Sequence, residues 1–236
     1  LSEADLNARA AEVAKIAHLT KTEGVGRNDL LKDAVAAAHH EIARKVAENS
    51  SVLLKNASAT LPLQSGTCVA VIGDMAKTPR FQGSGSSKVN ATREENILDE
   101  LKNAAATTGV TVAGYAQGYD RQGAKNQTLI DEAKTLAAAD TTDAVIAVVG
   151  LDERSESEGL DRSTMAIPQV QNDLVDALTA TGKPVIVVLV AGSPVELPWF
   201  DAVSAILYVG LSGQAGASAT VRALTGQINP SGHLAE

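Results

Sequence analysis

The stretch DAVIAVVG at Asp143–Gly150 decides the fold class, because it is apolar at almost every position and rich in β-branched residues. A strand with one buried face alternates apolar and polar side chains, whereas a strand buried on both faces is a continuous apolar run. TCVAVIGD at Thr67–Asp74, PVIVVLVAG at Pro184–Gly192 and SAILYVG at Ser204–Gly210 follow the same pattern. These runs predict strands of a mostly parallel sheet that is covered on both faces.

Segments with helical periodicity separate these strands at the spacing of βαβ units. The predicted helices span residues 94–107, 128–139, 168–181 and 213–224, and GVTVAGY at residues 109–115 predicts one further strand. Strands and helices that alternate in this way are joined by right-handed crossovers, which place helices on both faces of the sheet. We therefore predict an α/β fold, a doubly wound, mostly parallel sheet in an α/β/α sandwich.

The beginning of the chain has a different character. Ser2 to Leu19 predicts a helix, with Ser2 as its N-cap and Asp5 in the capping-box position. A polar loop follows at Lys21 to Asp29, and a second helix is expected at residues 34–49. The sequence starts at Leu1 without methionine or a signal peptide, so we expect a piece of a longer protein. We divide it into a helix and loop at 1–33 and an α/β domain at 34–236.

Composition narrows the classes of partner and cofactor. The 236 residues carry a formal net charge of −8 and only 3% aromatic residues, so we expect no nucleic acid and no anionic membrane as a partner. No apolar run approaches the roughly 20 residues of a membrane span. Cys68 is the single cysteine, and the four histidines show no metal-ligand spacing, so we expect neither a metal nor another cofactor. The compartment, cytoplasmic or secreted, and homo-oligomer formation are left open.

Two loops that follow predicted strands carry most of the chemistry. QGSGSS at Gln82–Ser87 is small and rich in hydroxyls, and LDERSESEGLDR at Leu151–Arg162 is rich in carboxylates and contains two arginines. Ligands of open parallel sheets bind outside the carboxyl ends of the strands, and both loops leave from such ends. Hydroxyls, carboxylates and arginines at one edge suit a polyhydroxylated ligand.

A nucleotide site and a glycosidase carboxylate pair are two specific interpretations of these loops. QGSGSS lacks the G-x-G-x-x-G pattern and does not open a helix directly after its strand, so a nucleotide-binding domain is the weaker alternative. A retaining glycosidase places two carboxyl groups about 5–5.5 Å apart around one sugar. Glu156 and Glu158 lie two residues apart on one loop and cannot easily surround a sugar ring. The chain therefore offers at most one member of such a pair.

Several sequence blocks between Ala34 and Leu234 follow one another in a characteristic order. They are ARKVAENSSVLLKN, VAVIGD, QGSGSS, ADTTDAVIAVVGLDERSESEGLDR, IPQVQNDLVDAL, KPVIVVLVAGSPVEL and INPSGHL. Together they resemble the second, α/β-sandwich domain of glycoside hydrolase family 3, the family of β-glucosidases and relatives. Residues 1–33 resemble the linker that leaves the family's first domain, a (β/α)8-type barrel. The resemblance implies that this barrel is a partner within the same enzyme.

The resemblance also implies site residues. The family's nucleophile is an Asp of the barrel, so no residue of this chain takes that role. The segment SEGLDR implies Glu158 as the general acid/base, with Glu156 as the fallback. Ser86, together with Ser84 and Arg162, is implied in binding a β-glycoside substrate. Many members of the family carry an aromatic residue at the position of Leu160, directly before the Asp-Arg pair at 161–162. With leucine there, this loop offers no aromatic ring to stack against a sugar.

The implied activity is that of a retaining β-glycosidase that hydrolyses terminal β-linked sugars, with the isolated chain inactive. The alternative is a non-catalytic sugar-binding or structural module. A general acid needs a pKa raised above the usual value of about 4.3 for Glu. Carboxylates near Glu158 would raise its pKa, while Arg154 and Arg162 would lower it, and the sequence leaves that balance open.

Overall fold

The computed structural model describes residues 2–20, 33–121 and 123–235. The chain divides into two compact units, Leu1–Ala38 and His39–Glu236. Helix α1 (Glu3–Leu19) begins with the predicted capping box, because the Ser2 side chain accepts from the Asp5 N–H and the Asp5 carboxylate accepts from the Ser2 N–H, both at 3.2 Å. The predicted loop at residues 21–29 lies outside the described residues.

The second unit is built on one six-stranded sheet with the strand order β1-β6-β5-β4-β2-β3. The strands are β1 (Val52–Asn56), β2 (Cys68–Ile72), β3 (Thr111–Ala116), β4 (Ala144–Gly150), β5 (Val185–Val190) and β6 (Ala205–Tyr208). β1 runs antiparallel to β6, and the other pairs are parallel. The prediction of a mostly parallel sheet is confirmed.

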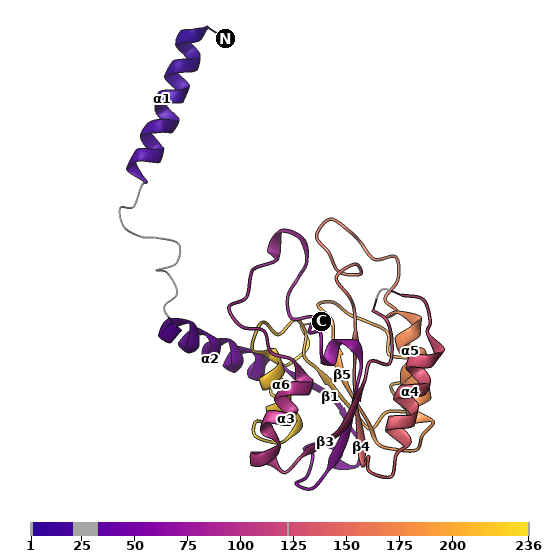
Figure 1. Cartoon of the computed structure of the whole chain (residues 1–236). Helices are drawn as coiled ribbons and strands as arrows, with labels where there is room; N and C mark the ends of the chain where they lie inside the picture. Colours follow the sequence, from indigo (N-terminus) through magenta and orange to yellow (C-terminus); the bar gives the residue numbers. More distant parts are fainter. Residues whose placement is uncertain (1, 21–32, 122, 236) are drawn as a thin grey trace. The chain divides into compact units, whose positions relative to one another are not determined.

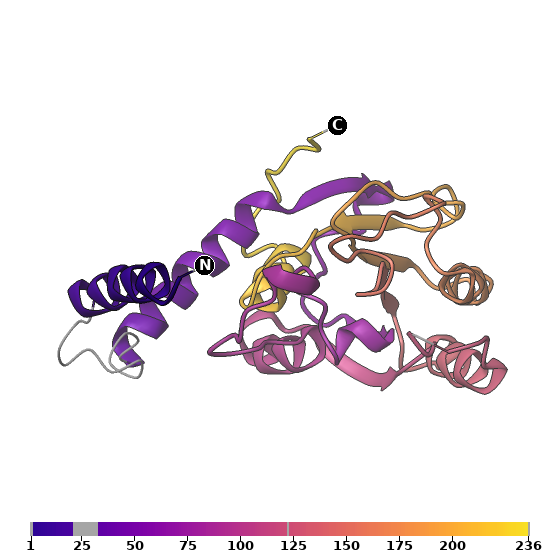
Figure 2. The same cartoon turned by 90° about the horizontal axis from the view of Figure 1, so that it is seen from above.

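Helices cover both faces of this sheet, as Figures 1 and 2 show. The covering helices are α3 (Ile97–Thr108), α4 (Gln127–Ala138), α5 (Gln169–Thr179) and α6 (Gly216–Leu224), while α2 (Asp33–Ser50) precedes β1. α3 and α6 lie on one face, and α4 and α5 lie on the other. The doubly wound α/β/α prediction is confirmed. α3 begins three residues later than predicted, because Asn96 is its N-cap and accepts a hydrogen bond from the Asp99 N–H.

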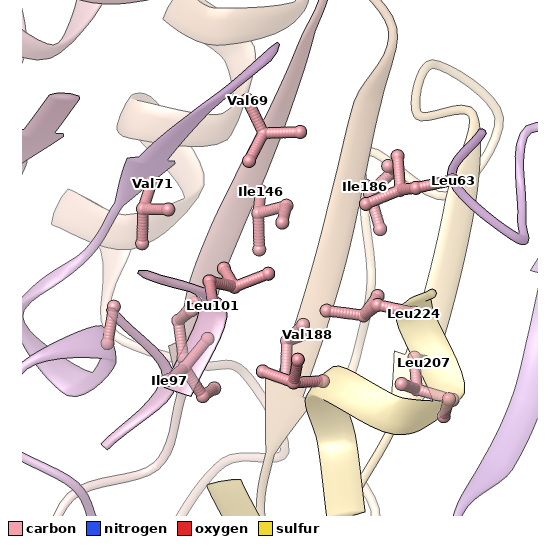
Figure 3. Close-up of a cluster of buried hydrophobic side chains, with 14 of the residues drawn as sticks. Leu63, Val69, Val71, Ile97, Leu101, Ile146, Ile186, Val188, Leu207 and Leu224 are labelled. Atoms are coloured by element: carbon pink, nitrogen blue, oxygen red, sulfur yellow. The ribbon is translucent and has the colours of Figure 1, made fainter. Parts of the chain in front are cut away.

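Alternate residues of each central strand enter different cores. Ile146 and Val148 of β4 pack toward α3 and α6, whereas Val145, Ala147 and Val149 pack toward α4 and α5. Figure 3 shows the first of these cores, where Ile146 lies among side chains of neighbouring strands and helices. Every residue of β4 is buried. This two-sided burial is the physical reason for the continuous apolar pattern in the sequence.

The strand order reverses between β2 and β4. From β2 the chain continues outward to β3, and it then returns to β4 on the other side of β2 and proceeds to β5 and β6. Such a reversal is a topological switch point, where the loops on either side diverge and leave a crevice. The two loops that flank this switch point are the loop after β2 (residues 73–96, the β2 loop) and the loop after β4 (residues 151–168, the β4 loop). The fold therefore brings the two loops of interest to the same place.

In the part of the chain that the structure describes, no helix has the length and apolarity needed to cross a membrane.

We expect Gly73→Ala to destabilise this domain far more than Gly182→Ala. Both glycines have positive φ, +121° and +77°, so each substitution strains the backbone by about 1–2 kcal/mol. At Gly73 a Cβ would also lie 2.2 Å from the Val148 carbonyl oxygen, whereas at Gly182 it meets nothing within 4 Å. Urea denaturation should show a loss at least about 2 kcal/mol larger for Gly73→Ala. Equal losses would contradict this packing.

Candidate functional site

The β2 and β4 loops are in direct contact at the switch point. Ser84 and Ser157 form an isolated parallel β-bridge between them. In Figure 1 both loops project beyond the same edge of the sheet, the edge formed by the carboxyl ends of the parallel strands. The sequence predicted that the two loops lie at one edge of the sheet, and in the structure they are in contact there.

Glu158 is held by the β2 loop while its carboxyl group stays exposed. Its Oε2 accepts a hydrogen bond from the Ser86 N–H at 2.9 Å and another from the Ser86 hydroxyl. Gly85 permits this approach, because a Cβ there would lie 2.9 Å from the Cβ of Glu158. Gly85 also has a φ of +83°, a conformation that glycine adopts without strain. The predicted substrate contact Ser86 is thus, in this structure, the partner of Glu158.

These contacts determine the direction of the pKa shift of Glu158, which the sequence left open. The hydrogen bond from the Ser86 hydroxyl, and then that from its N–H, lower the pKa of Glu158. The neighbouring carboxylate of Glu153 is itself engaged, since Arg121 Nη1 donates to it at 3.0 Å. Arg121 also donates from Nε to Asp74 at 2.7 Å, which ties the β4 loop to the end of β2. In this domain Glu158 is therefore favoured in its ionised form.

Glu156 is in a different environment from Glu158. Its side chain is only 13% exposed, and it forms an ion pair with Arg80. The Glu156 carboxylate also accepts from the Gly192 N–H at 3.0 Å and from the Ser193 hydroxyl. Burial would raise the pKa of Glu156, but the hydrogen bonds from Ser193, Arg80 and Gly192 outweigh it and lower the pKa. Glu156 is thus fully occupied in joining the β4 loop to the loop after β5 (residues 191–204, the β5 loop).

Arg80 was not singled out from the sequence. Its side chain is 1% exposed, and Nη1 donates to the Leu151 carbonyl at 2.9 Å as well as to Glu156. Arg162, predicted to bind substrate, points to the β5 loop: Nη2 donates to the Ser193 hydroxyl at 3.0 Å and to the Pro194 carbonyl at 2.8 Å. The signal that could have identified Arg80 is an arginine close to the end of β2, in a loop that faces an acid-rich loop across a switch point.

A broad depression of about 710 Å³ opens beside these loops. Its walls combine the carboxylates of Glu156 and Asp161, the guanidinium group of Arg162 and several hydroxyls with the apolar side chains of Leu160 and Met165. Among the described residues, no group of three His, Cys, Asp or Glu side chains could hold a metal ion. Trp199 is buried and donates from Nε1 to Asn172 at 2.9 Å, away from this depression. The chemistry of the walls suits hydroxyl-rich ligands.

The fold and these loops are those of a known class of α/β domain. The model of the glycosyl hydrolase family 3 C-terminal domain matches residues 51–236. The chain belongs to this family.

Similar proteins are longer enzymes. The chain is 40% identical to Thermostable beta-glucosidase B of Acetivibrio thermocellus, with all of this chain aligned to 30% of that protein. It is 37% identical to an Exo-alpha-(1->6)-L-arabinopyranosidase of Bifidobacterium breve over 84% of this chain and 27% of the relative. The crystal structure of a Bifidobacterium adolescentis GH3 beta-glucosidase superposes with a TM-score of 0.75 at 38% identity, covering 83% of this chain and 28% of that one. The chain thus spans about a third or less of these relatives.

We expect Ser86→Ala to raise the pKa of Glu158 toward the usual value, about 4.3, since the hydroxyl hydrogen bond, the larger of the two effects that lower this pKa, would be lost. Carboxyl chemical shifts followed through a pH titration report this pKa. Ser87→Ala is the matched control, because the Ser87 hydroxyl donates to the Ser84 carbonyl and not to Glu158. An unchanged Glu158 titration in Ser86→Ala, or the same change in both variants, would contradict the contact.

Proposed function

We propose that this domain supplies the general acid/base of a retaining β-glycosidase and that Glu158 takes this role. The observation that carries the proposal is the exposed carboxylate of Glu158, held by Ser86 at the switch point where open α/β sheets bind ligands. Membership of the glycosyl hydrolase family 3 supports the reaction class. The alternative of a non-catalytic module remains the outcome if Glu158 proves dispensable.

The environment of each carboxylate favours Glu158 over Glu156. A general acid/base exchanges a proton with the substrate and with water, so its carboxyl group must be within reach of both. Glu158 is exposed, whereas Glu156 is largely buried and bound by Arg80, Gly192 and Ser193. Protonating Glu156 would also cost the ion pair with a buried guanidinium group. Glu156 is therefore assigned a structural role.

The proposed reaction needs a second carboxylate from outside this chain. In the first step protonated Glu158 donates its proton to the glycosidic oxygen while the C1–O bond breaks, and a nucleophilic carboxylate forms the bond to C1. In the second step the Glu158 carboxylate takes a proton from water, whose oxygen bonds to C1 and releases the nucleophile. The proposed source of the nucleophile is a barrel domain, to which residues 1–33 form the link while 34–236 form the sandwich domain.

The hydrogen bonds from Ser86 suit one of these two steps. They favour the carboxylate form of Glu158, which is the form required to activate water. Proton donation in the first step requires a higher pKa. Closure of the site between this domain, the substrate and the barrel would bury the carboxyl group and raise its pKa. Ser86, Ser84 and Arg162 would then line the substrate side of the closed site.

The proposed substrate is a terminal β-linked sugar. The depression lined by Glu156, Asp161 and Arg162 carries polar groups that suit sugar hydroxyls, and two of the similar proteins carry the name β-glucosidase. Another similar protein is named for an arabinopyranoside, so relatives with this domain differ in their sugars. Because the loops here form one side of the site, the barrel would contribute the remaining contacts that select the sugar.

In the full-length protein, Glu158→Ala should lower turnover of β-glucosides with poor leaving groups by about 10²–10⁴-fold, the usual contribution of a general acid. Substrates with good leaving groups should lose less, and azide should restore part of the deglycosylation rate because it needs no general base. Steady-state kinetics on an aryl β-glucoside series measure both effects. Glu132→Ala, an exposed glutamate on α4, is the control. If Glu158→Ala shows neither effect, Glu158 is not the acid/base.

The chain 1–236 by itself should hydrolyse aryl β-glucosides no faster than buffer does, because it lacks an opposed nucleophile. The assay compares equimolar chain 1–236 and full-length protein on the same substrate. Turnover by the isolated chain at enzyme-like rates, about 1 s⁻¹ or faster, would overturn the split site.

A further inference from the structure

We infer that Arg80 is a positioning residue for the reaction and that it acts on Glu158 through Glu156. This inference rests on the proposed function, because it concerns how the acid/base is held. Arg80 lies in the β2 loop, and its guanidinium group contacts the β4 loop at two points, the Leu151 carbonyl and the Glu156 side chain. We call Arg80 and Glu156 together the Arg80–Glu156 strut.

The strut is buried on the arginine side and anchored at the sheet. Leu151, whose carbonyl accepts from Arg80, is the first residue after β4, and its own N–H donates to the Val190 carbonyl at 2.9 Å. The guanidinium group of Arg80 is therefore bound to a backbone carbonyl whose position the sheet fixes. A buried guanidinium group without its carboxylate is strongly unfavourable, so burial and ion pairing fix the arrangement together.

At its other end the strut reaches a third loop. The Glu156 carboxylate accepts from the Gly192 N–H at 3.0 Å and from the Ser193 hydroxyl, both in the β5 loop. The Ser193 hydroxyl is also contacted by Arg162 at 3.0 Å. Hydrogen bonds thus run from the β2 loop through Glu156 to the β5 loop, and they hold the Glu156 carboxylate from several directions.

Ser157 connects the strut to Glu158. Ser157 pairs with Ser84, and the Glu158 carboxylate accepts from Ser86. The short segment 156–158 is therefore held by the strut at one end and by the β2 loop at the other. If Arg80 is replaced, Glu156 keeps its contacts with the β5 loop, but the segment loses its tie to the buried part of the β2 loop, and Glu158 keeps only its contacts with an exposed part of that loop. A displacement of about 1 Å in a catalytic group can cost about 10²-fold in rate.

Arg80 is proposed to touch neither the substrate nor the reacting atoms. Its side chain is almost fully buried, and its contacts in the structure are with Leu151 and Glu156. Its effect on catalysis should therefore pass through Glu158 and disappear when Glu158 is removed. This dependence separates a positioning role from a loss of general stability.

The test is a double-mutant cycle in the full-length protein with Arg80→Met and Glu158→Ala. Arg80→Met alone should lower kcat/KM for poor leaving groups by about 10–10²-fold and for good leaving groups by less. In the Glu158→Ala background the same change should cost less than about 3-fold. Arg222→Met is the control, because Arg222 also forms an ion pair, with Glu48 at 2.7 Å, but on α6. It should show no leaving-group dependence.

Arg80→Lys keeps the result decisive if Arg80→Met does not fold. Lysine retains the charge beside Glu156 but lacks the forked donors that reach both Glu156 and the Leu151 carbonyl. We expect a loss of about 5–10-fold with the same dependence on leaving group. Equal losses in both Glu158 backgrounds, or no loss in Arg80→Lys and Arg80→Met, would overturn the inference. Glu158→Ala measured alone decides the proposed function separately.

Discussion

Burial of β4 on both faces is the constraint on which the rest of this domain depends. All seven residues of β4 are buried, so helices must cover the sheet from both sides. Crossovers of one hand can supply two covering layers only if the chain winds outward from the centre in both directions. That winding creates the reversal between β2 and β4, and the loops that carry Glu158 and its partner Ser86 leave the sheet at this reversal. The position of the site thus follows from the burial of the central strand.

The sequence predicted the parts of the fold that local pattern determines. The continuous apolar runs of β2, β4, β5 and β6 require a sheet buried on both faces, and that prediction is confirmed. β1 was not predicted as a strand, because it is short, ends in Lys55 and Asn56 and lies at the sheet edge. Its antiparallel pairing with β6 depends on a contact about 150 residues away along the chain. No local pattern reports such a contact.

In the candidate site, too, local pattern predicts some features, and contacts between remote segments determine the others. Parallel strand ends share an edge, so the approach of the β2 and β4 loops could be predicted from the strand pattern alone. The sequence could not show that Glu156 is bound and largely buried while Glu158 is exposed, because the residues that pair with Glu156 and Glu153 come from remote segments. Arg80 reaches Glu156 from 76 residues away, and Arg121 reaches Glu153 from 32 residues away. The family resemblance ranked Glu158 before Glu156, but no local pattern in the sequence shows how differently the two side chains are bound and buried.

The two arginines also reduce the repulsion between carboxylates in the acid-rich β4 loop. Several ionised carboxylates in one short loop repel one another and raise each other's pKa values, which couples their titrations. Arg80 pairs with Glu156, and Arg121 pairs with Asp74 and Glu153, so these charges are compensated within the scaffold. Glu158 is left with the neutral donors of Ser86. For the proposed acid/base role, this arrangement would let the protonation of Glu158 respond to burial by a substrate and a second domain rather than to its acidic neighbours.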